Sequence, residues 1–275
     1  MNSETPLVSI CCITYNHEKY IRECIEGFLM QKTSFPIEIL IYDDASTDKT
    51  QEIIKYYAND NQNIISFLQT ENQWQHKRYG LIDWLFPAAK GKYIALCEGD
   101  DYWTDPLKLQ RQVDFLEVNQ SYNICFTYSS VIGDSATVIS GSDKLTVMQY
   151  TQYDILIGKK YQTRTATILA RSFALKTKFN NKIHNGDTWF KIMATRNSRG
   201  IVLPFNSAVY RIHQGGVWST ASRLFQSKIM FLDWAEKLKY ALMHNYRAVL
   251  PIVAFFCIAF IKLIVLYAAK FISNK

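Results

Sequence analysis

The fold of this chain is decided by the stretch Lys92-Tyr93-Ile94-Ala95-Leu96-Cys97-Glu98-Gly99-Asp100-Asp101. Its first six residues are apolar and β-prone, which predicts a buried strand. Three acids follow at once, and Gly99 among them allows a tight turn. Carboxylates packed this closely repel each other and are costly to bury without partners. A divalent cation such as Mg²⁺ or Mn²⁺ removes both problems, because these ions prefer hard oxygen ligands. A solvated acidic turn is the competing interpretation.

A second apolar run has the same kind of ending. Residues 37–42 lead into Asp43-Asp44, and Ser46 or Thr47 is placed to cap a following helix, with Asp48 near its positive end. Two strands that end in carboxylates and precede helices imply a parallel sheet, in which ligands bind beyond the carboxyl ends of the strands. Both acidic groups are therefore expected to line one crevice.

Strands and helices alternate around these two segments. The expected strands are 8–15, 37–43, 64–68 and 92–97, and the expected helices are 18–30, 47–59, 80–89 and 106–116. This rhythm indicates βαβ units in a doubly wound, mainly parallel α/β sheet. Beyond Ile124 the pattern is mixed, with strands expected at 126–132, 137–139, 165–170 and 201–212 and a short helix at 187–195.

Composition limits the class of protein. The 275 residues suit one large domain or a domain with an appendage. The formal charge is +7, but the basic residues form no long run with interleaved aromatics, so no nucleic acid partner is expected. The six cysteines are expected to be reduced residues, mostly in the core, of a cytosolic protein, with Cys11 and Cys12 on opposite faces of one strand. The N-terminus lacks a basic-then-apolar signal sequence.

The last quarter of the chain has a different character. Residues 219–247 are expected to form a basic amphipathic juxtamembrane helix, and residues 248–272 a hydrophobic membrane segment. About 20 apolar residues are enough to cross a bilayer core. Lys262 leaves open whether the segment spans the membrane or lies within it, and a buried helix or hairpin partner is the competing interpretation. The basic residues that precede it favour the cytoplasmic side. They are Arg223, Lys228, Lys237, Lys239 and Arg247.

Four motifs together resemble the family 2 glycosyltransferases of bacterial cell-surface polysaccharide synthesis. They are 8–16, 43–48, 89–106 and 210–218, and they cover most of residues 6–218. The resemblance implies the GT-A nucleotide-sugar-binding fold for residues 1–218. It also implies a cytoplasmic location at the bacterial inner membrane, where nucleotide sugars are available. Trp103 and Trp218 would stack on a sugar or pack in the core.

The resemblance assigns a nucleotide-binding group. Its residues are Thr14, Tyr15, Asn16, Asp43, Arg78 and Asp100. Thr14 and Tyr15 would contact the base, although both could be ordinary β-prone residues. Asp43 would accept a hydrogen bond from the base, although the same side chain could cap a helix. Many relatives have a glycine in the loop before Arg78, whereas this chain has Trp74, which puts the geometry of that loop and the contact from Arg78 to the diphosphate in question.

The resemblance also assigns the metal site and the base. Asp101 would be the direct ligand of Mg²⁺ or Mn²⁺, and Asp100 would serve the ribose or a metal-bound water. His213 would face the diphosphate and the metal, and a structural histidine is its competing interpretation. Asp187 would be the catalytic base, and helix capping is its competing interpretation.

These groups imply an inverting, metal-dependent glycosyltransferase of the hexosyltransferase type. The donor would be a nucleoside-diphosphate sugar, with UDP favoured, and the acceptor a saccharide or a lipid-linked saccharide, as in lipopolysaccharide or exopolysaccharide synthesis. A cation would stabilise the leaving diphosphate, and a carboxylate would accept the proton of the acceptor hydroxyl. A metal-dependent nucleotidyltransferase and a non-catalytic, membrane-tethered nucleotide-sugar-binding module are the alternatives.

Overall fold

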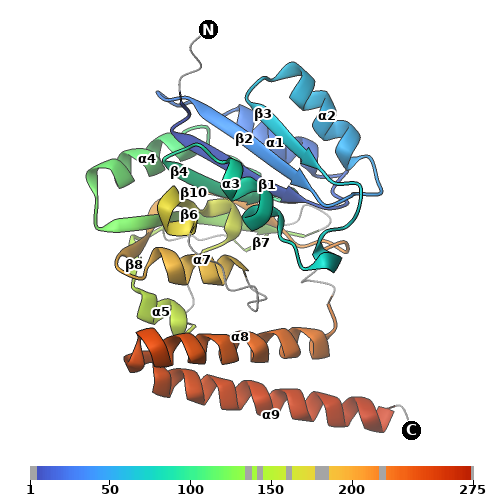
Figure 1. Ribbon diagram of the computed structural model, residues 1–275, viewed down its shortest axis with the longest axis vertical. Helices are drawn as coiled ribbons and strands as arrows, with labels where there is room; N and C mark the ends of the chain where they lie inside the picture. Colours follow the sequence, from blue (N-terminus) through green and yellow to red (C-terminus); the bar gives the residue numbers. More distant parts are fainter. Residues whose placement is uncertain are drawn as a thin grey trace.

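One sheet runs through the molecule, with helices on both faces (Figure 1). The computed structural model describes residues 5–133, 138–140, 145–158, 163–176, 186–216 and 221–273, so the expected sugar-stacking Trp218 and residue 137 of an expected strand lie outside the described residues. Within that part the sheet has ten strands, ordered β3-β2-β1-β4-β9-β6-β10-β5, while β7 pairs with β6 and β8 pairs with β10. The strands are β1 (Val8–Thr14), β2 (Ile37–Asp43), β3 (Ile64–Leu68), β4 (Tyr93–Glu98), β5 (Tyr102–Trp103), β6 (Tyr122–Ile132), β7 (Val138–Ser140), β8 (Met148–Tyr150), β9 (Leu169–Arg171) and β10 (Arg199–Arg211).

The first half of the sheet is parallel, as the βαβ pattern predicts. Strands β3, β2, β1 and β4 pair in parallel. The residues of β1, β2 and β4 are almost continuously buried, as expected for strands covered by helices on both faces. Cys11 and Cys12 belong to the two different hydrophobic clusters on either side of the sheet, which confirms that they point to opposite faces.

The second half of the sheet is mixed. Strand β9 is antiparallel to both β4 and β6, whereas β6 and β10 are parallel. The expected strand at 165–170 is wrong in part, because Thr165–Thr167 is a 3₁₀ turn (η3) and the strand begins at Leu169. The hydroxyl and the N–H of Thr167 both donate to the carbonyl oxygen of Arg164, at 2.7 and 3.0 Å, and these local bonds close the turn.

Helices cover the two faces in separate groups. One face carries α1 (Ile21–Leu29), α2 (Thr50–Asp60) and α4 (Lys108–Val118). The other carries η2 (Gly80–Leu85), α3 (Phe86–Ala88), α5 (Gln152–Leu156), α6 (Ser172–Leu175) and α7 (Gly186–Ala194). The expected helix at 80–89 is confirmed over residues 80–88, but its first part is not an α-helix. Residues 80–85 are π-helical, and Pro87 has no N–H to continue an α-helical ladder.

Helix α2 begins three residues later than expected, and neither Ser46 nor Thr47 caps it. The N–H of Ser46 donates to Asp43 at 2.9 Å, and the N–H of Thr50 donates to Asp48 at 2.9 Å. The two aspartates therefore satisfy the donors of this loop, and the first helical residue is Thr50.

A helical hairpin lies below the sheet (Figure 1). It consists of α8 (Arg223–His244), a 3₁₀ turn η4 (Tyr246–Ala248) and α9 (Val249–Ser273). Helix α8 joins the core through Tyr240, whose ring lies 5.2 Å from that of Trp189. Helix α9 packs on α8, with the rings of Trp234 and Phe255 stacked at 5.0 Å. One helix in the described residues, Tyr246–Ala269, is long and apolar enough to cross a membrane.

Candidate active site

The ends of β1, β2 and β4 lie side by side at one edge of the sheet. Thr14 is paired with Asp43 on one side, and Ile13 is paired with Glu98 on the other. The two acidic segments therefore meet at one edge, which is what parallel pairing of their strands predicts.

Three carboxylates gather in the turn after β4. One oxygen each of Glu98, Asp100 and Asp101 lies within 4.8 Å of the others. Asp101 is 1% exposed; its Oδ1 accepts from the N–H of Arg211 at 2.9 Å, and its Oδ2 has no hydrogen-bond partner among the described residues. Burial, with the charges of Glu98 and Asp100, raises the pKa of Asp101 well above its usual value. Burial, with Asp100 and Asp187, raises the pKa of Glu98 to about 8.

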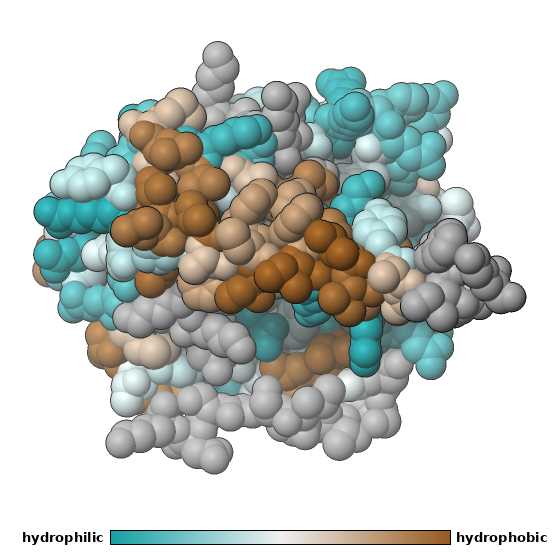
Figure 2. Space-filling model, turned by 90° about the horizontal axis from the view of Figure 1, so that it is seen from below, coloured by the Kyte–Doolittle hydropathy of each residue, from teal (hydrophilic) through white to brown (hydrophobic). Residues whose placement is uncertain are grey.

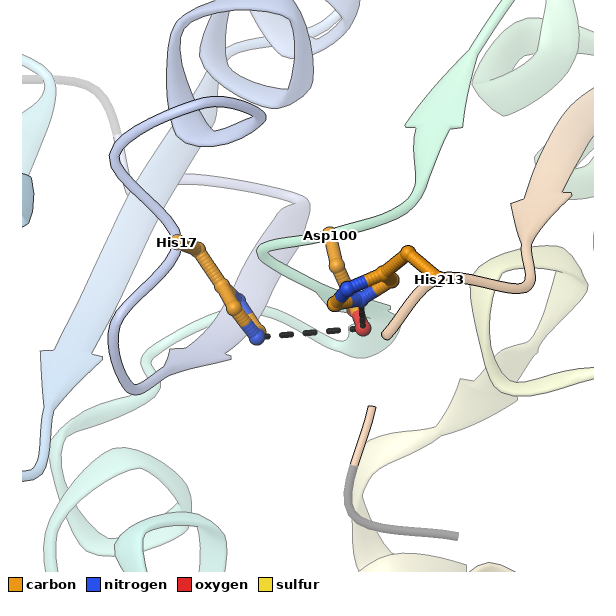
Figure 3. A group of neighbouring side chains, drawn as sticks. All are labelled: His17, Asp100 and His213. Atoms are coloured by element: carbon orange, nitrogen blue, oxygen red, sulfur yellow. Dashed lines mark hydrogen bonds and ion pairs between the residues drawn. The ribbon is translucent and has the colours of Figure 1, made fainter. Parts of the chain in front are cut away.

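Two histidines converge on Asp100 from distant parts of the chain (Figure 3). Asp100 Oδ2 lies 3.0 Å from His213 Nε2 and 3.7 Å from His17 Nε2. The N–H of Gly215 donates to His213 Nδ1 at 3.1 Å, so the ring proton belongs on Nε2 and is donated to Asp100. Burial lowers the pKa of His17 and favours its neutral form. Sequence reasoning missed His17, because nothing in its local pattern indicates a ligand.

This donor set suits a divalent cation. Two half-buried carboxylates beside a buried one repel each other, and one buried Asp101 oxygen has no hydrogen-bond partner among the described residues; a cation would relieve both features. Carboxylate oxygens suit Mg²⁺ and Mn²⁺, and neutral imidazole nitrogens favour transition metals over Mg²⁺. The residues present therefore fit the expected metal.

Two arginines surround the acidic turn, and neither was predicted. Arg211, at the end of β10, donates from Nη1 to the carbonyl oxygen of Asp100 at 3.0 Å, and its guanidinium lies 4.5 Å from the ring centre of Tyr102. It also pairs with Glu23 of α1. Arg164 stacks 4.3 Å from the ring centre of Tyr210, and its charge counteracts the rise in the pKa of Asp101. Both arginines lie near the turn because of the order of the strands in the sheet. That order cannot be predicted from the local sequence.

Asp187 lies in the first turn of α7. Its Oδ2 forms an ion pair with Lys191 Nζ at 2.7 Å, and its Oδ1 accepts from the N–H of Thr188 at 2.7 Å. Burial by itself would raise the pKa of Asp187, but the Lys191 ammonium and these hydrogen bonds hold it below the usual value. The charge of Asp187 in turn contributes to the raised pKa of Glu98.

The residues expected to contact the nucleotide base are largely built into the loops. Thr14 is buried, and a Cβ on Gly99 would lie 2.7 Å from its Oγ1. Asn16 has a left-handed backbone (φ 56°), and its Oδ1 accepts from the N–H of Thr47 at 2.8 Å. Asp43 is fully buried and accepts from Ser46 and from Gln51 Nε2. In this structure these three residues shape the loops at the sheet edge.

Two other predicted nucleotide contacts are exposed. The side chain of Tyr15 is 41% exposed at the end of β1. The guanidinium of Arg78 lies 4.4 Å from the ring centre of Trp84, and Trp74, which occupies the expected glycine position, packs edge-on against Tyr79 at 5.4 Å. The structure therefore places Arg78 on an aromatic ring of η2.

The fold and the acid-lined strand ends define a GT-A domain. The chain belongs to glycosyl transferase family 2, since residues 9–180 match the sequence profile of that family. It is 35% identical over 215 residues to the uncharacterized protein Rv1520 of Mycobacterium tuberculosis, a match that covers 78% of this chain and 61% of that relative. The match thus spans about three fifths of the relative's length.

Two further similarities concern proteins with stated activities or ligands. The Escherichia coli protein WfaP, a UDP-Glc:alpha-D-GlcNAc-diphosphoundecaprenol beta-1,3-glucosyltransferase, is 33% identical over 135 residues, covering 49% of this chain and 50% of WfaP. The crystal structure of S. aureus TarS 1–349 in complex with UDP-GlcNAc superposes with a TM-score of 0.68 at 22% identity, covering 91% of this chain and 71% of TarS. The structural likeness confirms the GT-A fold.

Proposed function

We propose that this protein is an inverting, metal-dependent glycosyltransferase that moves a sugar from a UDP-sugar to a lipid-linked or saccharide acceptor in cell-surface polysaccharide synthesis. The observation that carries this proposal is the gathering of Glu98, Asp100 and Asp101 at the carboxyl edge of the parallel strands. Family membership supports the reaction type, and the names of WfaP and TarS support a UDP-sugar donor.

The acidic turn would hold the metal. Asp101 and Asp100 are the proposed carboxylate ligands, and His213 would join them by giving up its hydrogen bond to Asp100. A bound Mg²⁺ or Mn²⁺ supplies Lewis-acid stabilisation of the negative charge on the leaving diphosphate. Arg211 holds the turn in place, because its N–H fixes Asp101 and its guanidinium fixes the Asp100 carbonyl.

Asp187 would act as general base. Its lowered pKa keeps it ionised at neutral pH, and Lys191 fixes its orientation from one turn further along α7. The carboxylate would take the proton from the acceptor hydroxyl as that oxygen attacks the sugar. Attack from the side opposite the diphosphate would invert the anomeric centre.

The acceptor would be presented at a membrane. WfaP acts on a diphosphoundecaprenol-linked sugar according to its name, and the apolar helix α9 would hold this protein at the cytoplasmic face of the inner membrane, where a lipid-linked acceptor is found. The hairpin α8–α9 is packed beneath the GT-A domain, so the domain would stay close to the lipid surface.

A product assay tests the proposal. The purified full chain is incubated with a panel of UDP-sugars, Mn²⁺ and an undecaprenyl-diphosphate-linked acceptor, and the products are identified by mass spectrometry. We expect a glycosylated acceptor and free UDP. Transfer of a nucleotidyl group would support the nucleotidyltransferase alternative, and donor binding without any turnover would support the binding module.

A further inference from the structure

A cavity of about 630 Å³ lies beside the turn that joins α8 to α9. Residues of α5, the segment that follows α7, and the hairpin turn contribute to its wall, including Thr151, Arg196, Asn197, Asn245 and Arg247. No acidic residue is among the described residues that line it, and none of the lining residues belongs to the active-site cluster. The cavity is therefore a separate, positively charged site.

The wall of this cavity is held by buried hydrogen bonds. Gln152 Nε2 donates to the carbonyl oxygen of Ile192 at 3.0 Å and to the hydroxyl of Tyr240 at 2.9 Å, which ties α5 to α7 and α8. Asn245 Nδ2 donates to Gln152 Oε1 at 3.4 Å, which adds the hairpin turn. The site is consequently formed only when the hairpin is docked on the domain.

The chemistry of the lining is that of a phosphate site. Arg196 and Arg247 are exposed, and neither forms an ion pair with a carboxylate in the described residues. Guanidinium groups match the geometry of phosphate oxygens, and the amides of Asn197 and Asn245 add neutral donors. Two unpaired positive charges at one opening favour an anionic ligand.

The neighbouring helix α9 points to a lipid as the source of that phosphate. Its inner side packs on α8 through Phe255 and Phe256, whereas its outer side exposes Leu250 and Ile258 at 81% and 61%. Seen from below, hydrophobic side chains form a band across this face of the molecule (Figure 2). Helix α9 packs lengthwise on α8, so its outer side is the side that can face a bilayer.

We propose that α9 lies along the bilayer surface and that the cavity at the α8–α9 turn binds the phosphate of an anionic lipid headgroup between Arg196 and Arg247. This inference rests on the membrane association proposed above. Charge supports it, because basic residues outnumber acidic ones in the hairpin, as suits an anionic leaflet. The basic residues are Arg223, Lys228, Lys237, Lys239, Arg247, Lys262 and Lys270, and the acidic ones are Asp233 and Glu236.

Vesicle sedimentation tests the proposal. The full chain is mixed with vesicles of phosphatidylcholine alone or of phosphatidylcholine with phosphatidylglycerol, and the double variant Arg196→Gln/Arg247→Gln is compared with the wild type. The matched control is Lys49→Gln/Lys55→Gln, which removes two exposed charges at α2. We expect the arginine variant to lose at least about fivefold in apparent affinity for the anionic vesicles, and the control to lose much less. Binding to phosphatidylcholine alone should not change.

Three outcomes would overturn the inference. Equal losses in both double variants would show that only overall charge matters. If inorganic phosphate raises the melting temperature of the wild type but not of the arginine variant, while vesicle binding is equal in both, the cavity takes free phosphate. If the wild type binds no vesicle at all, the membrane association itself is wrong, whereas glycosyl transfer to a soluble acceptor would still support the proposed reaction.

Discussion

Asp101 and Asp187 are two carboxylates with opposite surroundings, and the proposed function gives each a role. Asp101 is buried beside other acids, which raises its pKa, whereas Lys191 and local hydrogen bonds lower the pKa of Asp187. Carboxylates whose pKa values are pushed apart usually have different roles in catalysis. In the proposed mechanism Asp187 is ionised by its own surroundings, and a bound cation would stabilise the charged form of Asp101.

The first prediction concerns Asp101→Asn. The amide oxygen can still accept from the N–H of Arg211, so the turn should keep its shape, but the charge that would bind the metal is lost. We expect the affinity for Mn²⁺, measured by isothermal titration calorimetry, to weaken strongly. Sugar transfer should fall to the background rate. The melting temperature without metal should not fall, because the raised pKa favours a neutral Asp101 carboxyl and the amide has the same shape. Full activity of this variant in the presence of a chelator would sink the proposed metal site.

The second prediction concerns the base. Asp187→Asn should lower turnover by about 100-fold or more while donor binding persists, because only proton transfer is removed. Lys191→Met serves as the companion variant, since loss of the ammonium removes the main cause that lowers the pKa of Asp187. The acid limb of the pH–rate profile should therefore move to higher pH in Lys191→Met. An unmoved limb would show that Asp187 does not control it.

The third prediction concerns a lysine outside the site. Lys108 is completely buried, donates to Gln112 at 2.8 Å, and lies 4.1 Å from the ring centre of Trp103. Burial lowers its pKa to about 8, against about 10.4 in an unfolded chain. Between these values the unfolded state binds more protons, so the stability of the folded protein rises with pH and is lost as pH falls toward 8.

Lys108→Met removes this linkage. When the pH is lowered from 10.4 to 7, the free energy of unfolding of the variant should rise relative to that of the wild type. The expected change is about 3 kcal/mol for a pKa shift of this size. Urea unfolding at both pH values measures the change, and other titrating groups cancel because both proteins carry them. A pH-independent difference between the two proteins would mean that Lys108 has an ordinary pKa.

Among the elements, strands β1, β2 and β4 could be predicted because each is a run of consecutive apolar residues, which indicates a strand buried on both faces. The carboxyl-end position of the acids followed from parallel pairing. The 3₁₀ turn before β9 could not be predicted, because the hydrogen bonds of Thr167 competed with a strand pattern. His17 and Arg211 were missed for a different reason. Their contacts with Asp100 depend on the order of β1, β4 and β10 in the sheet, which the sequence pattern does not give.

For the C-terminal helix, too, one property could be predicted from the sequence and another could not. Its extent was predicted closely, since α9 covers Val249–Ser273. Its packing on α8 could not be predicted, because hydropathy does not show which helix a segment contacts. In the structure the ring of Phe231 of α8 lies 4.8 Å from that of Phe256. The hairpin alternative is therefore correct for the contact with α8, while the outer face of α9 keeps the composition of a membrane segment.

The fourth prediction follows from this two-sided helix. Deleting residues 248–275 would uncover Phe231 and Trp234, so we expect a cleaner result from serines on the outer face alone. The triple variant Ile258→Ser/Ile261→Ser/Val265→Ser changes three side chains that are each about 60% exposed. Most of the protein should move from the membrane to the soluble fraction with its melting temperature retained. If the variant still pellets after a high-salt wash, the anchor lies elsewhere.

Helix α8 lies between the GT-A domain and helix α9. Burial lowers the pKa of Lys237 on this helix to about 8, and the charges of Asp233 and of Asp187 counteract that change. The same helix carries Trp234, which stacks on α9. The residues around the proposed base and the apolar face are therefore parts of one packed unit, and docking on a membrane would fix the site relative to the lipid surface.

The last prediction uses the cysteines to measure this docking. All six cysteines are free; five are buried in the GT-A domain, and Cys257 is exposed on α9. A maleimide reagent that cannot cross membranes should label one thiol per native molecule in solution and six after denaturation. With anionic vesicles, labelling of Cys257 should slow strongly, because an interfacial helix buries its apolar side below the headgroups. The Ile258→Ser/Ile261→Ser/Val265→Ser variant should keep the rate seen in solution. If Cys257 of the wild type reacts equally fast with and without vesicles, α9 does not enter the bilayer, and another surface must bring this enzyme to its acceptor.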